Sequence, residues 1–150
     1  MIPEQNNKYL IVTSPAAIID NTSPTTNSID TKGFDYLTVL CSVGATDVAM
    51  TALKLGQSDT DSSYTDVTGL VFGTSTNIDG ATSALPTATD DNKIFVFEVD
   101  LRGKKRDFDM TATFGNGTAG GYFSAVAILS RAEISPITAA GKGADEVLRA

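Results

Sequence analysis

Between residues 106 and 114, apolar and polar residues alternate one by one. The polar members are Asp107, Asp109, Thr111 and Thr113, and the apolar members are Phe108, Met110, Ala112 and Phe114. Successive side chains of a β-strand point to opposite faces of a sheet, so this period of two predicts a strand with one buried face and one wet face. We therefore expect Asp107 and Asp109 on the solvent side.

Seven further segments predict strands through their β-branched and aromatic residues, and they recur at the spacing of a sandwich. They lie near residues 8–13, 16–20, 34–43, 47–57, 64–72, 93–101 and 121–131. Eight antiparallel strands with long connections favour a two-sheet antiparallel sandwich that is jelly-roll-like. An immunoglobulin-like sandwich is the alternative, but the chain has no Trp for the Cys…Trp…Cys pattern of that fold.

The chain divides into three predicted parts. Residues 29–135 form the β-sandwich core, residues 1–28 an N-terminal arm with the first strand or strands, and residues 136–150 a C-terminal arm. Within the core, residues 74–92 form a long polar loop, and a loop of that length is usually functional or an interaction element. The fold class is thus all-β, with extended N- and C-terminal arms.

Composition removes several classes of chemistry. The 150 residues carry 18 acidic and 11 basic side chains, and the net charge of −7 argues against a nucleic-acid partner. His is absent, which excludes imidazole bases and His-ligated metals. The one Cys, Cys41, lies in an apolar strand with no His to activate it, so we expect it to act as a small hydrophobic residue. We predict no enzymatic activity, no cofactor and no metal.

The N-terminal residues lack the basic region and apolar core of a signal peptide. No stretch approaches the ~20 apolar residues that span a bilayer. We therefore expect synthesis in the cytoplasm without export, and no membrane partner.

Two motifs have both a functional and a structural interpretation. Residues 115–120 match G-x-G-x-x-G, but a dinucleotide site requires a helix after the motif and the sequence that follows is strand-like, so we expect a hairpin loop. Residues 59–66 space oxygen ligands like a calcium loop. The Gly and Glu that such a loop needs are replaced by Tyr64 and Leu70, so a strand-connecting hairpin is our interpretation.

Four basic residues gather within five positions: Arg102, Lys104, Lys105 and Arg106. Such a run usually makes a solvated turn. The alternative is a contact for an acidic partner surface, because an isolated basic patch on an acidic protein can dock by charge complementarity. We take these four residues as the candidate partner contact. No aromatic residue is interleaved with them, as a nucleic-acid site would need.

Two blocks and two shorter segments carry a family resemblance. The blocks are residues 29–39, which read IDTKGFDYLTV, and residues 88–106; the segments are residues 57–69 and 127–133. Together they resemble small structural proteins of tailed bacteriophages and prophages, in particular the single-domain β-sandwich cement or decoration proteins of the phage head. The resemblance covers about residues 29–135 and includes no catalytic motif.

The resemblance implies a virion protein that binds the outside of the phage head and stabilises the shell by bridging major capsid protein subunits. It also implies self-association, with a homotrimer favoured. On this view we expect residues 1–8 and 135–150 to reach neighbouring subunits. Two alternatives remain open. One is another virion component, such as a head fibre, collar or tail-associated protein that binds a receptor or carbohydrate. The other is a hydrolase that uses Asp107 and Asp109.

Overall fold

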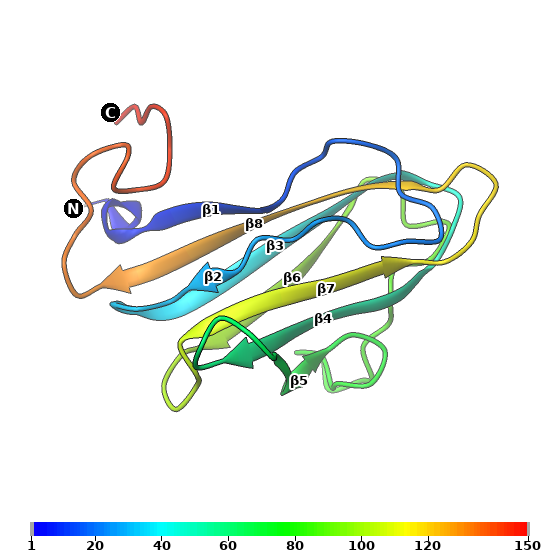
Figure 1. Ribbon diagram of the computed structural model, residues 1–150, viewed down its shortest axis with the longest axis horizontal. Helices are drawn as coiled ribbons and strands as arrows, with labels where there is room; N and C mark the ends of the chain where they lie inside the picture. The colour runs from blue at the N-terminus through cyan, green and yellow to red at the C-terminus, as the bar shows by residue number, and fades with distance from the viewer. Residues whose placement is uncertain (1, 150) are drawn as a thin grey trace.

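The computed structural model describes residues 2–149, which form one short 3-10 turn and eight strands (Figure 1). The elements are η1 (Pro3–Asn6), β1 (Lys8–Thr13), β2 (Ile29–Asp30), β3 (Phe34–Thr46), β4 (Met50–Ser58), β5 (Thr65–Val71), β6 (Lys93–Asp100), β7 (Asp107–Phe114) and β8 (Gly121–Ala132). Residues 1 and 150, the outermost residues of the predicted arms, lie outside this part. Within it, no helix has the length and apolar character needed to cross a membrane.

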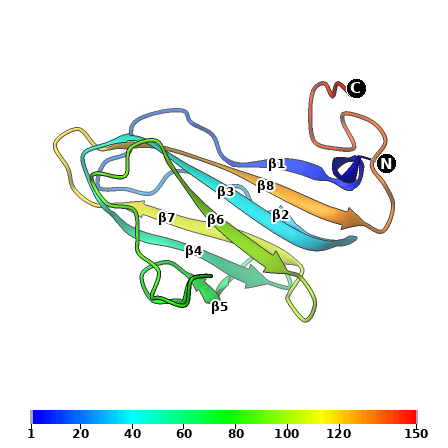
Figure 2. The same cartoon turned by 180° about the vertical axis from the view of Figure 1, so that it is seen from behind.

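The strands form two four-stranded sheets, and every pair is antiparallel. Sheet A has the order β1-β8-β3-β6, and sheet B has the order β2-β7-β4-β5. The pairs β1–β8, β2–β7, β3–β6 and β4–β5 are nested, as in one long hairpin that has been rolled up. This nesting is the topology of an eight-stranded jelly roll, so the predicted fold class is confirmed. Figures 1 and 2 show the two sheets stacked as layers.

All but one of the predicted strands are present. The exception is the strand expected at residues 16–20, where Ile19 alone forms a bridge, to Gly121. That prediction is wrong because Pro15 lacks an N–H donor and the chain turns at Asn21, whose φ is 49°. The two-residue strand β2 was not expected, since two residues carry no periodic signal.

The core lies between the sheets and consists of the inward side chains of both. Phe114 of β7 and Phe123 of β8 meet edge to face across it, with ring centroids 6.1 Å apart. Cys41 of β3 is fully buried and donates its S–H to the Met110 sulfur of sheet B over 3.6 Å. Burial raises the pKa of the Cys41 thiol to about 12. The predicted role of Cys41 as a small hydrophobic residue is therefore confirmed.

Both terminal segments lie outside the sandwich and at the same end of it (Figures 1 and 2). The segment after β8 contains turns but no strand or helix in its described residues, and it folds back onto η1 and β1. The backbone N–H of Tyr9 donates to the carbonyl of Lys142 over 2.7 Å. This bond covers part of the open edge of sheet A, where an unpaired strand would otherwise invite other chains.

Candidate functional site

The four predicted contact residues lie together in the turn between β6 and β7, but three of them already face acids. Arg102 pairs with Asp100, and Arg106 forms a two-pronged pair with Asp30 in which its Nε–Oδ1 distance is 2.8 Å. The ammonium of Lys105 lies 3.1 Å from an Asp59 carboxylate oxygen. Three aspartates, one for each of these basic residues, thus neutralise most of the positive charge at this turn.

Lys104 is the member of the cluster without an ion pair among residues 2–149, and it is exposed. The hydrogen bonds from Arg106 hold the pKa of Asp30 near 2, and those from Arg102 do the same for Asp100. The turn is therefore a set of exposed ion pairs that fix its shape, with Lys104 as its free cation within the described chain.

The acids of the calcium-like segment are divided among separate partners. Asp59 faces Lys105, Asp66 lies 2.7 Å from the Lys54 ammonium, and Asp61 accepts a hydrogen bond from the Tyr64 hydroxyl. Tyr64 thereby lowers the pKa of Asp61. The part of the chain that the structure describes contains no group of three or more His, Cys, Asp or Glu side chains that could hold a metal ion.

Asp107 and Asp109 were both expected to face solvent, and the structure differs for Asp107. Asp107 is only 7% exposed, because it lies between Asp30 of β2 and Ser58 of β4 in the middle of sheet B. The short strand β2, which the sequence did not predict, supplies this cover. Asp109 is half-buried and accepts a hydrogen bond from the next backbone N–H. The prediction of a solvated carboxylate pair is thus wrong for Asp107.

The glycine-rich residues 115–120 form the loop between β7 and β8, as expected, and this loop holds a carboxylate of its own chain. Asp47 accepts hydrogen bonds from the backbone N–H groups of Thr118, Ala119 and Gly120 over 3.0, 2.8 and 2.8 Å. These bonds, with those from Ala119 and Gly120 contributing most, lower the pKa of Asp47. The backbone N–H groups of this loop, which could otherwise bind a phosphate, are therefore occupied by the Asp47 carboxylate.

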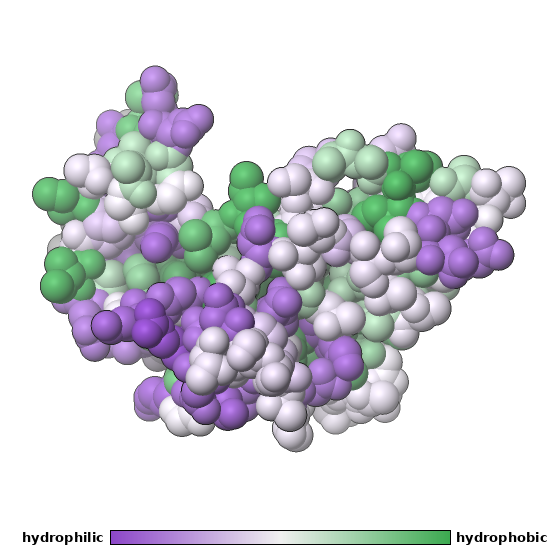
Figure 3. Space-filling model, in the orientation of Figure 1, coloured by the Kyte–Doolittle hydropathy of each residue, from purple (hydrophilic) through white to green (hydrophobic). Residues whose placement is uncertain are grey.

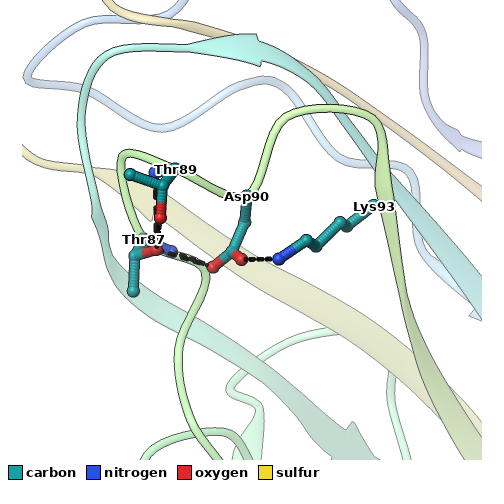
Figure 4. A network of polar contacts seen from close by, with 4 residues as sticks. All are labelled: Thr87, Thr89, Asp90 and Lys93. Atoms are coloured by element: carbon teal, nitrogen blue, oxygen red, sulfur yellow. Dashed lines mark hydrogen bonds and ion pairs between the residues drawn. The ribbon is translucent and has the colours of Figure 1, made fainter.

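The predicted long loop is ordered by its own polar side chains. Figure 4 shows Asp90 between Thr87 and Lys93. One Asp90 oxygen accepts from the Thr87 backbone N–H over 2.7 Å, and the other accepts from the Lys93 ammonium over 2.6 Å. These bonds, with that from Lys93 the strongest, hold the pKa of Asp90 near 2. The end of the loop is thereby fixed where it enters β6.

The start of the same loop borders a groove of about 400 Å³ between the end of β5 and β6. Phe72 forms part of its wall and packs edge to face on Phe97, with ring centroids 4.9 Å apart. Side chains that can form hydrogen bonds line the rest, including those of Ser75, Thr76, Asn77, Ser83 and Glu98. The groove combines an apolar wall with polar groups, as small-ligand sites do.

The outer face of sheet A carries a row of apolar side chains that crosses all four strands. Register places Ile11 opposite Val126, Val126 opposite Leu40, and Leu40 opposite Val96. These four side chains, which we call the apolar row, are between 37% and 58% exposed. Directly opposite residues of an antiparallel pair lie on the same face, so the row is continuous.

The rows on either side of the apolar row are uncharged over most of their length. One contains Tyr9, Ile128 and Thr38 and ends at Glu98, and the other contains Ser124, Ser42 and Ile94. Figure 3 shows a notch in the upper outline of the molecule, with hydrophobic residues at its floor. Figure 1 places the notch above β1, the edge strand of sheet A, between the C-terminal segment and the connection from β1 to β2. The outer face of sheet A is therefore an uncovered apolar surface.

The outer face of sheet B is polar by contrast. Asp66 and Asp109 both lie opposite Gly56, and the neighbouring cross-strand pairs place Lys54 beside Thr111 and Ala52 beside Thr113. The two faces of one sandwich thus differ in chemistry. A sheet face that only has to meet water needs no apolar row, so the face of sheet A is the strongest candidate for an interaction surface.

The two terminal segments are fastened to each other by Lys142, which sequence reasoning did not single out. Lys142 is 2% exposed, and its ammonium donates to the backbone carbonyls of Glu4, Gln5 and Asn7 over 2.8, 2.7 and 3.0 Å. Burial lowers its pKa. Ser135 adds a hydrogen bond to the Asn6 side chain. We call this arrangement the terminal clasp. A lone Lys between two glycines gives no sequence signal for it.

Comparison with known proteins supports the fold. No family model matches the sequence, and no curated protein matches it. The fold defines the chain as an eight-stranded jelly-roll β-sandwich. It is similar to the crystal structure of the SPBc2 prophage-derived protein YomS, with a TM-score of 0.52 and 14% sequence identity, over 83% of this chain and 93% of YomS. At that identity the likeness shows a shared fold, and fold does not define function.

Proposed function

We propose that this chain is a structural protein of a phage particle, a cement or decoration protein that binds the outside of the head. It bridges major capsid protein subunits and associates with itself, with a trimer favoured. The observation that carries the proposal is the uncovered, largely uncharged outer face of sheet A. Such a face on a rigid sandwich fits protein association better than catalysis.

Two further observations support the proposal. The sequence resembles phage cement proteins in residues 29–135, and the similar structure YomS is by its title prophage-derived. The carboxylates of Asp47, Asp61 and Asp90 accept hydrogen bonds from their own chain and fix loops. A protein that stabilises a shell has to be rigid and to bind only the assembled state, because preferential binding shifts the assembly equilibrium.

The test is sedimentation of the purified chain with heads isolated from the phage or prophage that encodes it, after deletion of its gene. We expect the chain to pellet with the heads at a saturating ratio and to raise the temperature at which they disrupt. Intact heads that leave the chain in the supernatant at every concentration would contradict the proposal. Bovine serum albumin, another acidic protein, controls for trapping.

The groove beside β6 favours the second candidate, a tail- or fibre-associated protein that binds carbohydrate. Phe72 provides an apolar wall, and Asn77 and Glu98 can form hydrogen bonds with sugar hydroxyls. A glycan array with the wild-type chain and a Glu98→Ala variant tests it. Binding of a defined glycan that the variant loses would favour this candidate over the capsid role.

A further inference from the structure

Two apolar surfaces of this chain are uncovered. The first is the outer face of sheet A with its apolar row. The second lies on the C-terminal segment, residues 133–149, where Ile134, Ile137 and Leu148 are between 86% and 96% exposed. We propose that the C-terminal segment of one copy packs these side chains onto the outer face of sheet A of a second copy. The inference rests on the proposed function only for the self-association it specifies.

Charge favours a second copy at this face. Each chain has a net charge of −7, so repulsion between two copies is weakest where the face that receives the other copy carries few acids. The apolar row and the row of Ser124, Ser42 and Ile94 carry no charge. On sheet B, a second copy would meet Asp66 and Asp109 instead. The hydroxyls beside the apolar row both donate and accept hydrogen bonds, so a neutral partner satisfies them without an added charge.

The terminal clasp prepares the C-terminal segment for this contact. Lys142 and Ser135 bind the C-terminal segment to the N-terminal residues of the same chain. The segment is therefore already ordered, and the entropy cost of binding a second copy is smaller. In Figures 1 and 2 the segment projects past the end of sheet A. It covers the β1 edge at Tyr9 but leaves Ile11 exposed, so each copy keeps its own face open.

The area fits a specific interface. Four strands spaced ~4.8 Å apart and about six residues long present roughly 400 Å² on the outer face of sheet A. A contact buries that area on both partners, roughly 800 Å² in total, and two reciprocal contacts reach the roughly 1,600 Å² of a standard interface.

Mixed cysteine variants test the contact directly. Cys41 is fully buried and its thiol pKa is about 12, so the native chain offers no reactive thiol. We expect an Ile137→Cys chain mixed with a Val126→Cys chain to form a disulfide-linked species of twice the 15.7 kDa chain mass under mild oxidation. The matched control is Ile78→Cys with Val126→Cys, because Ile78 is 96% exposed but belongs to the loop after β5, beside the groove, and neither to the apolar row nor to the C-terminal segment.

Light scattering behind size exclusion gives the second readout. We expect the wild type to have the mass of two or more chains, and Ile134→Ser/Ile137→Ser and Leu40→Lys each to shift it to a single chain. The Ile78→Ser control should keep the wild-type mass, and circular dichroism should confirm that each variant folds. A wild type that remains a single chain, or variants that assemble as the wild type does, would overturn the inference.

The outcomes separate this inference from the proposed function. If the chain assembles through these surfaces but never binds heads, the inference stands and the capsid role fails. If a single chain binds heads and Leu40→Lys abolishes that binding, the occupant of the face is the shell, which overturns the inference and leaves the capsid role in place.

Discussion

At the scale of single residues, two charged side chains of this protein hold loops and termini in place through hydrogen bonds to backbone groups. Asp47 closes the glycine-rich loop, and Lys142 closes the terminal clasp. Both bind several backbone groups with one charged group, which gives stronger hydrogen bonds than neutral pairs would. These two charged side chains therefore fix loops and terminal segments at the surface of the protein.

Lys142→Met should weaken the clasp while keeping the buried aliphatic stem. Three carbonyls lose their shared donor, so we expect the free energy of unfolding to fall by about 1–3 kcal/mol. Urea unfolding followed by circular dichroism measures this change, and hydrogen exchange should accelerate at η1 and at Tyr9. Lys32→Met, at an exposed Lys without an ion pair in the described residues, is the control and should change little. Equal stability of Lys142→Met and the wild type would contradict the clasp.

Asp30→Asn should remove a stabilising pair whose effect depends on pH. The folded chain holds the pKa of Asp30 at about 2, below its ordinary value of 3.8, because Arg106 donates two hydrogen bonds to it. The stabilisation is complete above pH ~4 and disappears as the pH falls towards 2, since the unfolded state binds the proton first. For an exposed pair we expect less than about 1 kcal/mol.

Thermal unfolding of Asp30→Asn and the wild type at pH 6, 4 and 2 measures this dependence. The difference in Tm should be largest at pH 6 and close to zero at pH 2. Asp79→Asn, an exposed carboxylate with no cation partner in residues 2–149, should follow the wild type throughout. A constant difference across the range would mean that Asp30 acts through packing and not through its charge.

Some of these residues could be found from the sequence and others could not. The basic turn at Arg102–Arg106 was recognisable as a charge run, but two of its three neutralising acids, Asp30 and Asp59, are far away in sequence and reach it only through folding. The G-x-G-x-x-G match was interpreted as a hairpin loop, and only the structure shows that its backbone N–H groups bind Asp47. Residue pairing across a sandwich depends on strand register, which a local pattern does not fix.

At the scale of elements, periodicity predicted the strands well because most have one face in the core. In β7, Phe108, Met110 and Phe114 are buried as the alternation indicates. The same pattern failed at Asp107, because this residue has a strand on each side, with Asp30 and Ser58 directly opposite, and the strand that carries Asp30 has no pattern of its own. The apolar row shows the opposite departure: Val126 and Leu40 lie on strands that are apolar on both faces, and only one face has a partner within this chain.

Deletion of residues 135–150 should leave the sandwich folded, because the sheets and the core do not depend on that segment. We expect far-UV circular dichroism of a β-protein and a cooperative unfolding transition at a reduced Tm, since the Tyr9 N–H loses its partner at the β1 edge. Self-association and head binding should both weaken. Light scattering and head sedimentation measure them, and association at the wild-type level would exclude the segment as a contact.

At the scale of the whole molecule, the chain is a rigid block whose two sheet faces have opposite chemistry. The polar face of sheet B and the net charge of −7 keep copies apart in solution. In the proposed association, the apolar row of sheet A and the exposed Ile134 and Ile137 are the surfaces through which copies meet. A balance between long-range repulsion and a local apolar contact is sensitive to protein concentration and to salt.

That balance predicts a stability that depends on concentration. If association stabilises the folded chain, Tm rises with protein concentration by mass action, whereas the Tm of an isolated folded chain does not. We expect the wild-type Tm to increase by a few degrees over a hundredfold rise in concentration. The increase should be larger in 0.5 M than in 0.05 M sodium chloride, because salt screens the repulsion between acidic copies and leaves the apolar contact intact. Ile134→Ser/Ile137→Ser should abolish the concentration dependence, whereas Ile78→Ser should preserve it. A Tm independent of concentration in the wild type would mean that the apolar row is covered only when the chain binds another protein.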